Sequence, residues 1–138
     1  MAITAAFPTQ AKLDALIALC PPGNTYKIAL YTSAAALSAA STVYTTTGEV
    51  VGTGYTAGGA TLTGITQALD TTSAIMDFAD PTWANATITA RGAMIYDSTN
   101  GNKARAVLDF GADVTSTAAT YTVTLPAPAA ATAVIKIA

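Results

Sequence analysis

Downstream of residue 25, short segments alternate apolar and polar residues, and this alternation constrains the fold more than any other feature of the chain. The first segment, Tyr26–Tyr31, combines aromatic and β-branched residues, which favour a strand. Val43–Val51 gives an extended segment. Further strands are expected at Ala60–Ile65, Ser73–Phe78, Ala86–Ala90, Ala93–Asp97, Ala104–Phe110, Tyr121–Leu125 and Ala133–Ile137. Gly, Pro, Asn or Asp fills most of the gaps, and no helical pattern separates the strands. The sequence therefore predicts an all-β antiparallel sandwich rather than a parallel βαβ sheet.

One segment before the strands has helical periodicity. Residues 9–20, TQAKLDALIALC, place four apolar residues on one helical face, namely Leu13, Leu16, Ile17 and Cys20. Thr9 is the expected N-cap, because its hydroxyl can accept a hydrogen bond from an amide of the first turn. Pro21 and Pro22 end the helix, since neither can donate an amide hydrogen.

This change of periodicity suggests two regions. We expect an N-terminal arm and helix over residues 1–22, and a β-sandwich domain over residues 23–138. The helix either closes one end of the sheet core or docks on a neighbouring subunit. In the second case the candidate interface residues are Phe7, Leu13, Leu16 and Ile17.

The glycine-rich stretch VVGTGYTAGG, Val50–Gly59, superficially fits the G-x-G-x-x-A form of a dinucleotide-binding loop. Such a loop requires a helix that starts within it, because the helix N-terminus holds the pyrophosphate. The residues that follow alternate, are rich in Thr and favour a strand, so a cofactor role is rejected. We expect a contact loop at a sheet edge or subunit interface, with Gly52, Gly54, Tyr55 and Thr56 as candidate interface residues.

The clearest local unit is a hairpin around Asn100-Gly101, which accepts the positive φ angles of a tight turn. Ala93–Asp97 and Ala104–Phe110 are expected to pair antiparallel across it. Asp97, Asn100 and Asn102 superficially suggest a calcium loop. The acidic order of an EF-hand and its late Glu are missing, so turn chemistry explains these residues better.

Alternation also indicates the core. The candidates are Ile28, Leu30, Ile75 or Met76, Phe78, Ile88, Ile95, Leu108, Phe110, Val123, Leu125 and Ile135. Trp83 either anchors this core or presents its ring to a sugar, and a large ring beside a proline turn more often packs inward. Cys20, the single cysteine, is expected to be a small buried hydrophobe.

Composition excludes several classes of function. Charged residues make up 10% of the chain, against about 25% in a typical domain, and the net charge is −2. Lys and Arg are not clustered, as nucleic-acid binding would require. Histidine, the commonest general base and metal ligand, is absent. Asp77 and Asp80 are an odd number of residues apart, so a regular strand points them to opposite faces. We expect no catalytic residue, no metal and no cofactor.

Four stretches together resemble a family of small virion proteins of tailed bacteriophages. They are YKIALYTSAA (Tyr26–Ala35), YTTTGEVVGTGYTAGGATLTG (Tyr44–Gly64), DFADPTWANATITARGAMIYDSTNGNKARAVLDFG (Asp77–Gly111) and the final AVIKIA. Some similar proteins are capsid cement or head-decoration proteins with a jelly-roll-like sandwich, and others carry tail or fibre labels. The resemblance supplies no catalytic residues.

The resemblance implies a structural protein that binds the major capsid protein, as a homodimer or homotrimer, without contact to nucleic acid or membrane. Its expected location is the capsid surface of the virion, after synthesis in the bacterial host cytoplasm. Lys12 and Asp14 interrupt the apolar part of the N-terminus, which does not read as a signal peptide. The alternative is a tail or fibre module that binds a host glycan through Trp83, Tyr55 and other tyrosines.

Overall fold

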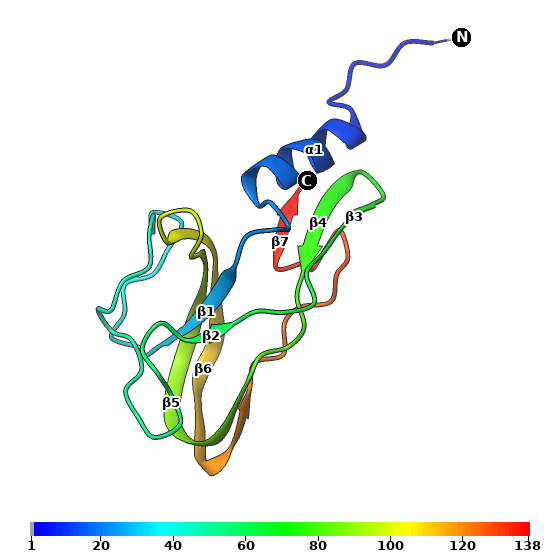
Figure 1. Ribbon diagram of the computed structural model, residues 1–138. Helices are drawn as coiled ribbons and strands as arrows, with labels where there is room; N and C mark the ends of the chain where they lie inside the picture. Colours follow the sequence, from blue (N-terminus) through cyan, green and yellow to red (C-terminus); the bar gives the residue numbers. More distant parts are fainter. Residues whose placement is uncertain (1) are drawn as a thin grey trace. The chain divides into compact units, whose positions relative to one another are not determined.

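A computed structural model of the protein describes residues 2–138 and contains one helix and seven strands. The elements are α1 (Thr9–Leu19), β1 (Tyr26–Tyr31), β2 (Ala60–Thr61), β3 (Thr66–Asp70), β4 (Ser73–Asp77), β5 (Thr82–Asp97), β6 (Lys103–Thr122) and β7 (Ile135–Ile137) (Figure 1). The strands form two antiparallel sheets. The fold class is therefore all-β with a short N-terminal helix, which is consistent with the predicted all-β sandwich.

The chain divides into two compact units. Unit 1 holds the residues up to Gly23 together with Gly64–Phe78 and Leu125–Ala138, and unit 2 holds Asn24–Thr63 and Ala79–Thr124. The first junction lies one residue from the expected boundary after residue 22. Unit 1 also includes β3, β4 and β7, so the helix belongs to a compact unit with a sheet of its own.

Unit 2 is a four-stranded sheet in the order β2-β1-β5-β6. The predicted antiparallel hairpin is confirmed: β5 pairs with β6 along nearly its whole length, and Ala93 lies opposite Leu108. At the turn, φ is 62° at Gly101 and 57° at Asn102, so the positive angles begin one residue later than Asn100. β1 lies between β2 and β5 in this sheet, and nearly every side chain of β1 is buried, on both faces of the strand.

Unit 1 is a three-stranded sheet in the order β3-β4-β7, with α1 packed against it. Leu16 and Cys20 are fully buried, which confirms the prediction for the cysteine. Gln67 of β3 donates its side-chain amide to the Cys20 carbonyl at 2.8 Å and so ties the end of the helix to the sheet. Lys12 of the helix donates to the Thr72 carbonyl at 2.7 Å at the β3–β4 turn. Both contacts fix the helix on this sheet.

Several local predictions were wrong. Ala86–Ala90 and Ala93–Asp97 belong to one strand, β5, and Tyr121–Leu125 is not a strand of its own, because β6 continues to Thr122 and ends there. The N-cap is Pro8 rather than Thr9, no side chain caps the helix, and Thr9 is its first residue. β3 was not expected, because TQALD carries few β-branched or aromatic residues and is largely exposed. It forms through backbone pairing with β4. Leu108 and Phe110 are half-buried rather than core, since β6 lies at the edge of its sheet. The other predicted core residues are buried.

Candidate protein interface

The helix and the segment before it expose apolar side chains. Exposure is 100% at Ile3, 59% at Phe7, 40% at Ile17 and 50% at Leu19. Among the candidate residues of this region, Leu13 is half-buried and Leu16 is fully buried, so Leu16 packs inside unit 1 and offers no surface. Of the four candidate residues in this region, Phe7 and Ile17 are therefore the ones whose side chains are exposed.

The second candidate region, the loop before β2, is held by the only glutamate of the chain. Glu49 is 9% exposed and accepts three hydrogen bonds. Tyr44 donates to Oε2 at 2.6 Å, Tyr55 donates to Oε1 at 2.6 Å, and the Gly58 amide donates to Oε1 at 2.8 Å. A desolvated carboxylate needs such donors, and here they come from Tyr44, before the glycine-rich stretch, and from Tyr55 and Gly58 within it. Glu49 therefore closes the loop on itself.

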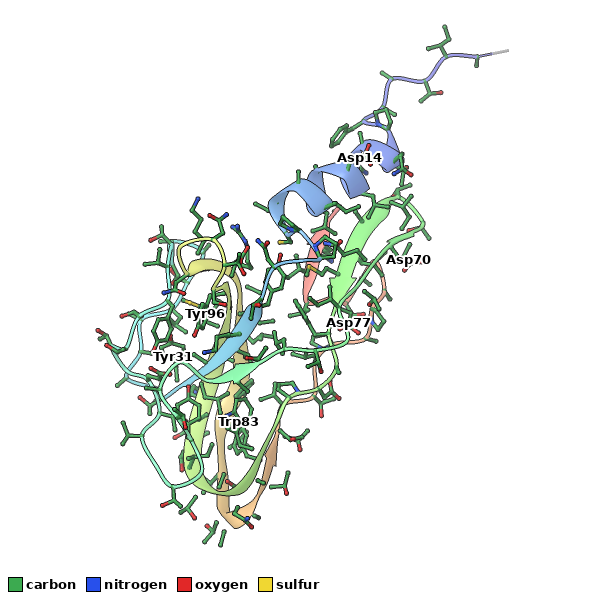
Figure 2. The ribbon with its side chains drawn as sticks, in the orientation of Figure 1. Asp14, Tyr31, Asp70, Asp77, Trp83 and Tyr96 are labelled. Carbon is green, nitrogen blue, oxygen red and sulfur yellow. The ribbon has the colours of Figure 1, made fainter. Side chains whose placement is uncertain are left out.

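Two further tyrosines fasten this loop to the sheet. Tyr96 of β5 donates to the Gly58 carbonyl at 2.6 Å and stacks on Tyr44 with ring centroids 4.8 Å apart. Tyr31 of β1 donates to the Thr45 carbonyl at 2.7 Å. Both rings are buried in a cluster with Ala29 and Met94 (Figure 2). The loop backbone is thereby anchored to β1 and β5.

Burial and the nearby carboxylate keep these phenols neutral. Burial raises the pKa of Tyr31 from its ordinary value of 10.0 to about 12. Burial is also the largest cause that raises the pKa of Tyr44 and Tyr55, followed for both by the hydrogen bond to Glu49. A phenolate beside Glu49 would lose that bond and face a like charge. The hydrogen bonds of this cluster therefore require the tyrosines to be protonated.

The glycines allow the loop to lie close to the strands. At Gly59 φ is +80°, and a Cβ there would overlap the Ile28 carbonyl oxygen. At Gly54 φ is +83°, which agrees with the expected role of a loop glycine. Gly52 has no positive φ, but a Cβ would come within 2.5 Å of the Thr87 carbonyl. Close approach to the strand backbone explains Gly52, and close approach together with a positive φ explains Gly59.

Tyr55 turns inward rather than out at the loop tip. Its hydroxyl donates to Glu49 and accepts the Leu30 amide at 2.9 Å, and its ring lies 6.1 Å from that of Trp83. Trp83 is 6% exposed and also contacts Tyr121 edge-on at 6.1 Å, which confirms that the indole packs inward. Thr56, next to Tyr55, is exposed. The exposed part of the loop therefore presents Val51, which is 96% exposed, and threonines rather than an aromatic stacking surface.

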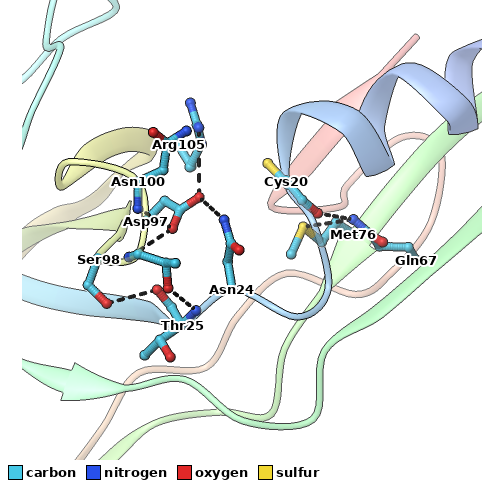
Figure 3. A network of polar contacts seen from close by, with 10 residues as sticks. Cys20, Asn24, Thr25, Gln67, Met76, Asp97, Ser98, Asn100 and Arg105 are labelled. Atoms are coloured by element: carbon cyan, nitrogen blue, oxygen red, sulfur yellow. Dashed lines mark hydrogen bonds and ion pairs between the residues drawn. The ribbon is translucent and has the colours of Figure 1, made fainter.

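The hairpin residues form a separate polar network in unit 2. Asp97 is fully buried, and its carboxylate accepts from the Asn24 side chain at 2.9 Å and from the amides of Thr99 and Asn100 at 3.1 and 3.2 Å (Figure 3). Arg105 approaches it at 3.8 Å. Asp97 thus closes the turn through hydrogen bonds. Asn102 contributes its positive φ to the turn.

The remaining acidic candidates, Asp77 and Asp80, do not lie on the same strand. Asp77 ends β4 in unit 1, whereas Asp80 precedes β5 in unit 2. Within residues 2–138, no three Cys, Asp or Glu side chains are grouped so that they could hold a metal ion. The sequence reasoning missed Glu49 as the centre of the loop. The available signal was a single glutamate among tyrosines and glycines, but only the fold brings those tyrosines to it.

Comparisons with known proteins add no relative. No protein-family model matches the chain, and neither a curated protein nor a solved structure matches it significantly. No helix within the described residues is long and apolar enough to cross a membrane.

Proposed function

We propose that the chain is a structural virion protein, a capsid cement or head-decoration protein that binds the major capsid protein and stabilises the shell. The observation that carries the proposal is the exposure of apolar side chains in the helix region, Phe7 and Ile17 among them. Burying such side chains against a partner contributes about 25 cal/mol per Å² before the costs of association. The low share of charged residues limits the desolvation cost at the contact.

The rigid loop supports the same role. Glu49 and its tyrosines hold the loop in one conformation, so that a partner contacting Thr56 would not have to order it. Preorganisation of this kind reduces the entropy lost on binding. We propose that this loop is a second contact, and that the protein acts without catalysis, as a homodimer or homotrimer on the virion.

Electron microscopy of the virus particle that carries this chain tests the location. Density on the capsid shell is expected, and density confined to the tail would overturn the proposal. A glycan array tests the tail-fibre alternative. The inward packing of Trp83 and Tyr55 removes the stacking surface that this alternative requires, so no binding is expected.

A pair of matched variants tests the surface. Phe7→Ser with Ile17→Ser removes apolar side chains that are 59% and 40% exposed, and Val43→Ser with Val114→Ser removes ones that are 48% and 44% exposed elsewhere. Binding to purified capsids is measured by co-sedimentation. The first variant should bind about tenfold more weakly, the equivalent of 1.4 kcal/mol, and the second should bind as the unmodified protein does. Equal binding by both would contradict the proposed surface.

A further inference from the structure

The turn between β5 and β6 contains the only Asn-Gly pair of the sequence, Asn100-Gly101, and both residues are exposed. Asparagine is a thermolabile residue, because the backbone nitrogen of the residue that follows it can attack the carbon of its side-chain amide. Glycine in that following position leaves the nitrogen unhindered, since it has no Cβ. The residue types at this turn therefore offer the least steric resistance to such an attack.

Both reacting groups of the pair are free. Within residues 2–138, no hydrogen bond engages either the side-chain amide of Asn100 or the backbone amide of Gly101. A Cβ placed on Gly101 would meet no atom within 4 Å, so the space around this position is open. The backbone amide of Asn100 bonds to Asp97 at 3.2 Å, which holds the residue in the turn without engaging its side chain (Figure 3).

Asn24, another asparagine of unit 2, has both reacting groups engaged. Its side-chain amide donates to the buried Asp97 at 2.9 Å. The backbone amide that follows it, that of Thr25, donates to the Thr99 hydroxyl at 2.8 Å. Thr25 is also β-branched, and two heavy atoms on its Cβ crowd the neighbouring nitrogen. Asn24 is therefore protected where Asn100 is not.

The two remaining asparagines are each protected by the residue that follows. The Lys103 amide, which follows Asn102, donates to the Asn100 carbonyl at 3.3 Å. Ala86, which follows Asn85, is fully buried. Asn102 is nevertheless exposed in the same turn as Asn100. It is therefore the internal control for any reaction that exposure alone would allow.

We infer that Asn100 is a site of spontaneous modification, which converts it to isoaspartate and aspartate. The Gly101 nitrogen gives up its proton and attacks Cγ of Asn100, so that an N–Cγ bond forms, the Cγ–Nδ2 bond breaks and ammonia leaves. Water then opens the resulting cyclic imide. Attack of water at Cγ gives aspartate, and attack at the former backbone carbonyl carbon gives isoaspartate. Each route consumes a water molecule, releases ammonia and replaces a neutral amide by a carboxylate.

Isoaspartate changes the backbone of the turn as well as its charge. It inserts the side-chain methylene into the main chain before Gly101 and turns the former carbonyl of residue 100 into a free carboxylate. The Lys103 amide bonds to that carbonyl, and the Asn102 carbonyl accepts the Tyr44 amide at 2.9 Å. A longer turn displaces both acceptors. Conversion to isoaspartate is therefore expected to loosen the turn and the contact with Tyr44.

Ageing of the purified full chain at mildly alkaline pH tests the site. Trypsin cleaves after Arg91 and Lys103, so one peptide carries both Asn100 and Asn102. Mass spectrometry of this peptide should show that Asn100 becomes an acid while Asn102 remains an amide, and electron-transfer fragmentation identifies isoaspartate. Equal conversion of both residues would overturn the inference. So would an intact Asn100 in the folded chain after the urea-unfolded chain has been fully converted.

Two variants test the attacking nitrogen. Gly101→Ala adds a Cβ beside it and should slow the conversion of Asn100 about tenfold. Asn102→Gln is the matched control, because it changes an exposed residue of the same turn and leaves the Asn-Gly pair intact. The control should react at the rate of the unmodified chain. An unchanged rate in Gly101→Ala would refute attack by the Gly101 nitrogen.

Hydrogen exchange tests the effect on the turn. The isoaspartate form, separated by chromatography from the aged sample, should lose protection at the Tyr44 amide. Asn100→Asp carries the same charge on a backbone of unchanged length and should keep that protection. Equal protection of the two forms would show that the longer backbone leaves the turn intact. None of these outcomes depends on a capsid partner, so the inference and the proposed function are separately testable.

Discussion

Tyr55 donates its phenol proton to Oε1 of Glu49 at 2.6 Å, while the same phenol oxygen accepts the Leu30 amide of β1 at 2.9 Å. This one side chain therefore joins the buried carboxylate of the loop to the backbone of a central strand. Because the hydroxyl both donates and accepts, neither partner is left unpaired in the interior. The rigidity of the glycine-rich loop follows from this arrangement.

Glu49→Gln should destabilise the fold by about 2–3 kcal/mol, since hydrogen bonds to a charged acceptor contribute most and an amide would present a donor to a donor. Unfolding in urea measures the change. Asp113→Asn, at an exposed carboxylate on β6, is the control and should have little effect. A change below about 0.5 kcal/mol for Glu49→Gln would mean that the carboxylate does not hold the loop.

Gly59→Ala should be severely destabilising, by about 4 kcal/mol or more, because the new methyl group would overlap a β1 carbonyl at a positive φ. Gly101→Ala also has a positive φ, of +62°, but meets no atom within 4 Å. It should cost only about 1 kcal/mol from the backbone conformation. Thermal unfolding of both variants separates steric overlap from backbone strain. Equal losses of stability in the two variants would show that overlap plays no part.

Alkaline pH should unfold the protein through its tyrosines. In the folded chain burial raises the pKa of Tyr31 from 10.0 to about 12, so above pH 10 the unfolded chain loses the phenol proton first. This contribution to stability is complete below pH 10 and is lost as the pH rises to about 12. Tyrosinate absorbance and the free energy of unfolding, measured on the same samples, check this. Ordinary titration of all six tyrosines near pH 10 in the folded protein would contradict it.

Asp97→Asn should loosen the β5–β6 turn and cost about 1.5–3 kcal/mol, because a buried amide group would replace an acceptor of three N–H groups. Amide hydrogen exchange should show reduced protection first at Thr99 and Asn100, whose amides donate hydrogen bonds to this side chain. Unchanged protection at these two amides would show that the backbone turn alone holds the hairpin.

Local sequence determined the features that depend on neighbouring residues. The alternating pattern predicted both ends of β1 correctly. Pro21 and Pro22 predicted the end of the helix to within two residues, and Asn100-Gly101 predicted the position of the hairpin turn. Each of these follows from backbone preferences that act over a few positions. The same reasoning failed for β3. Its residue types do not favour a strand, and it is held in the sheet by backbone pairing with β4.

The tertiary structure decided which polar groups meet. Tyr44 and Tyr55 lie within six residues of Glu49 in the sequence, whereas Tyr31 and Tyr96 come from β1 and β5, and only the fold brings their hydroxyls to the carbonyls of Thr45 and Gly58. Likewise, β6 became an edge strand through sheet order, which left Leu108 and Phe110 half-buried despite their apolar character. Alternation indicates which face of a strand is apolar, but burial also depends on whether a neighbour covers that strand. The order of strands in a sheet settles this, and long-range contacts determine that order.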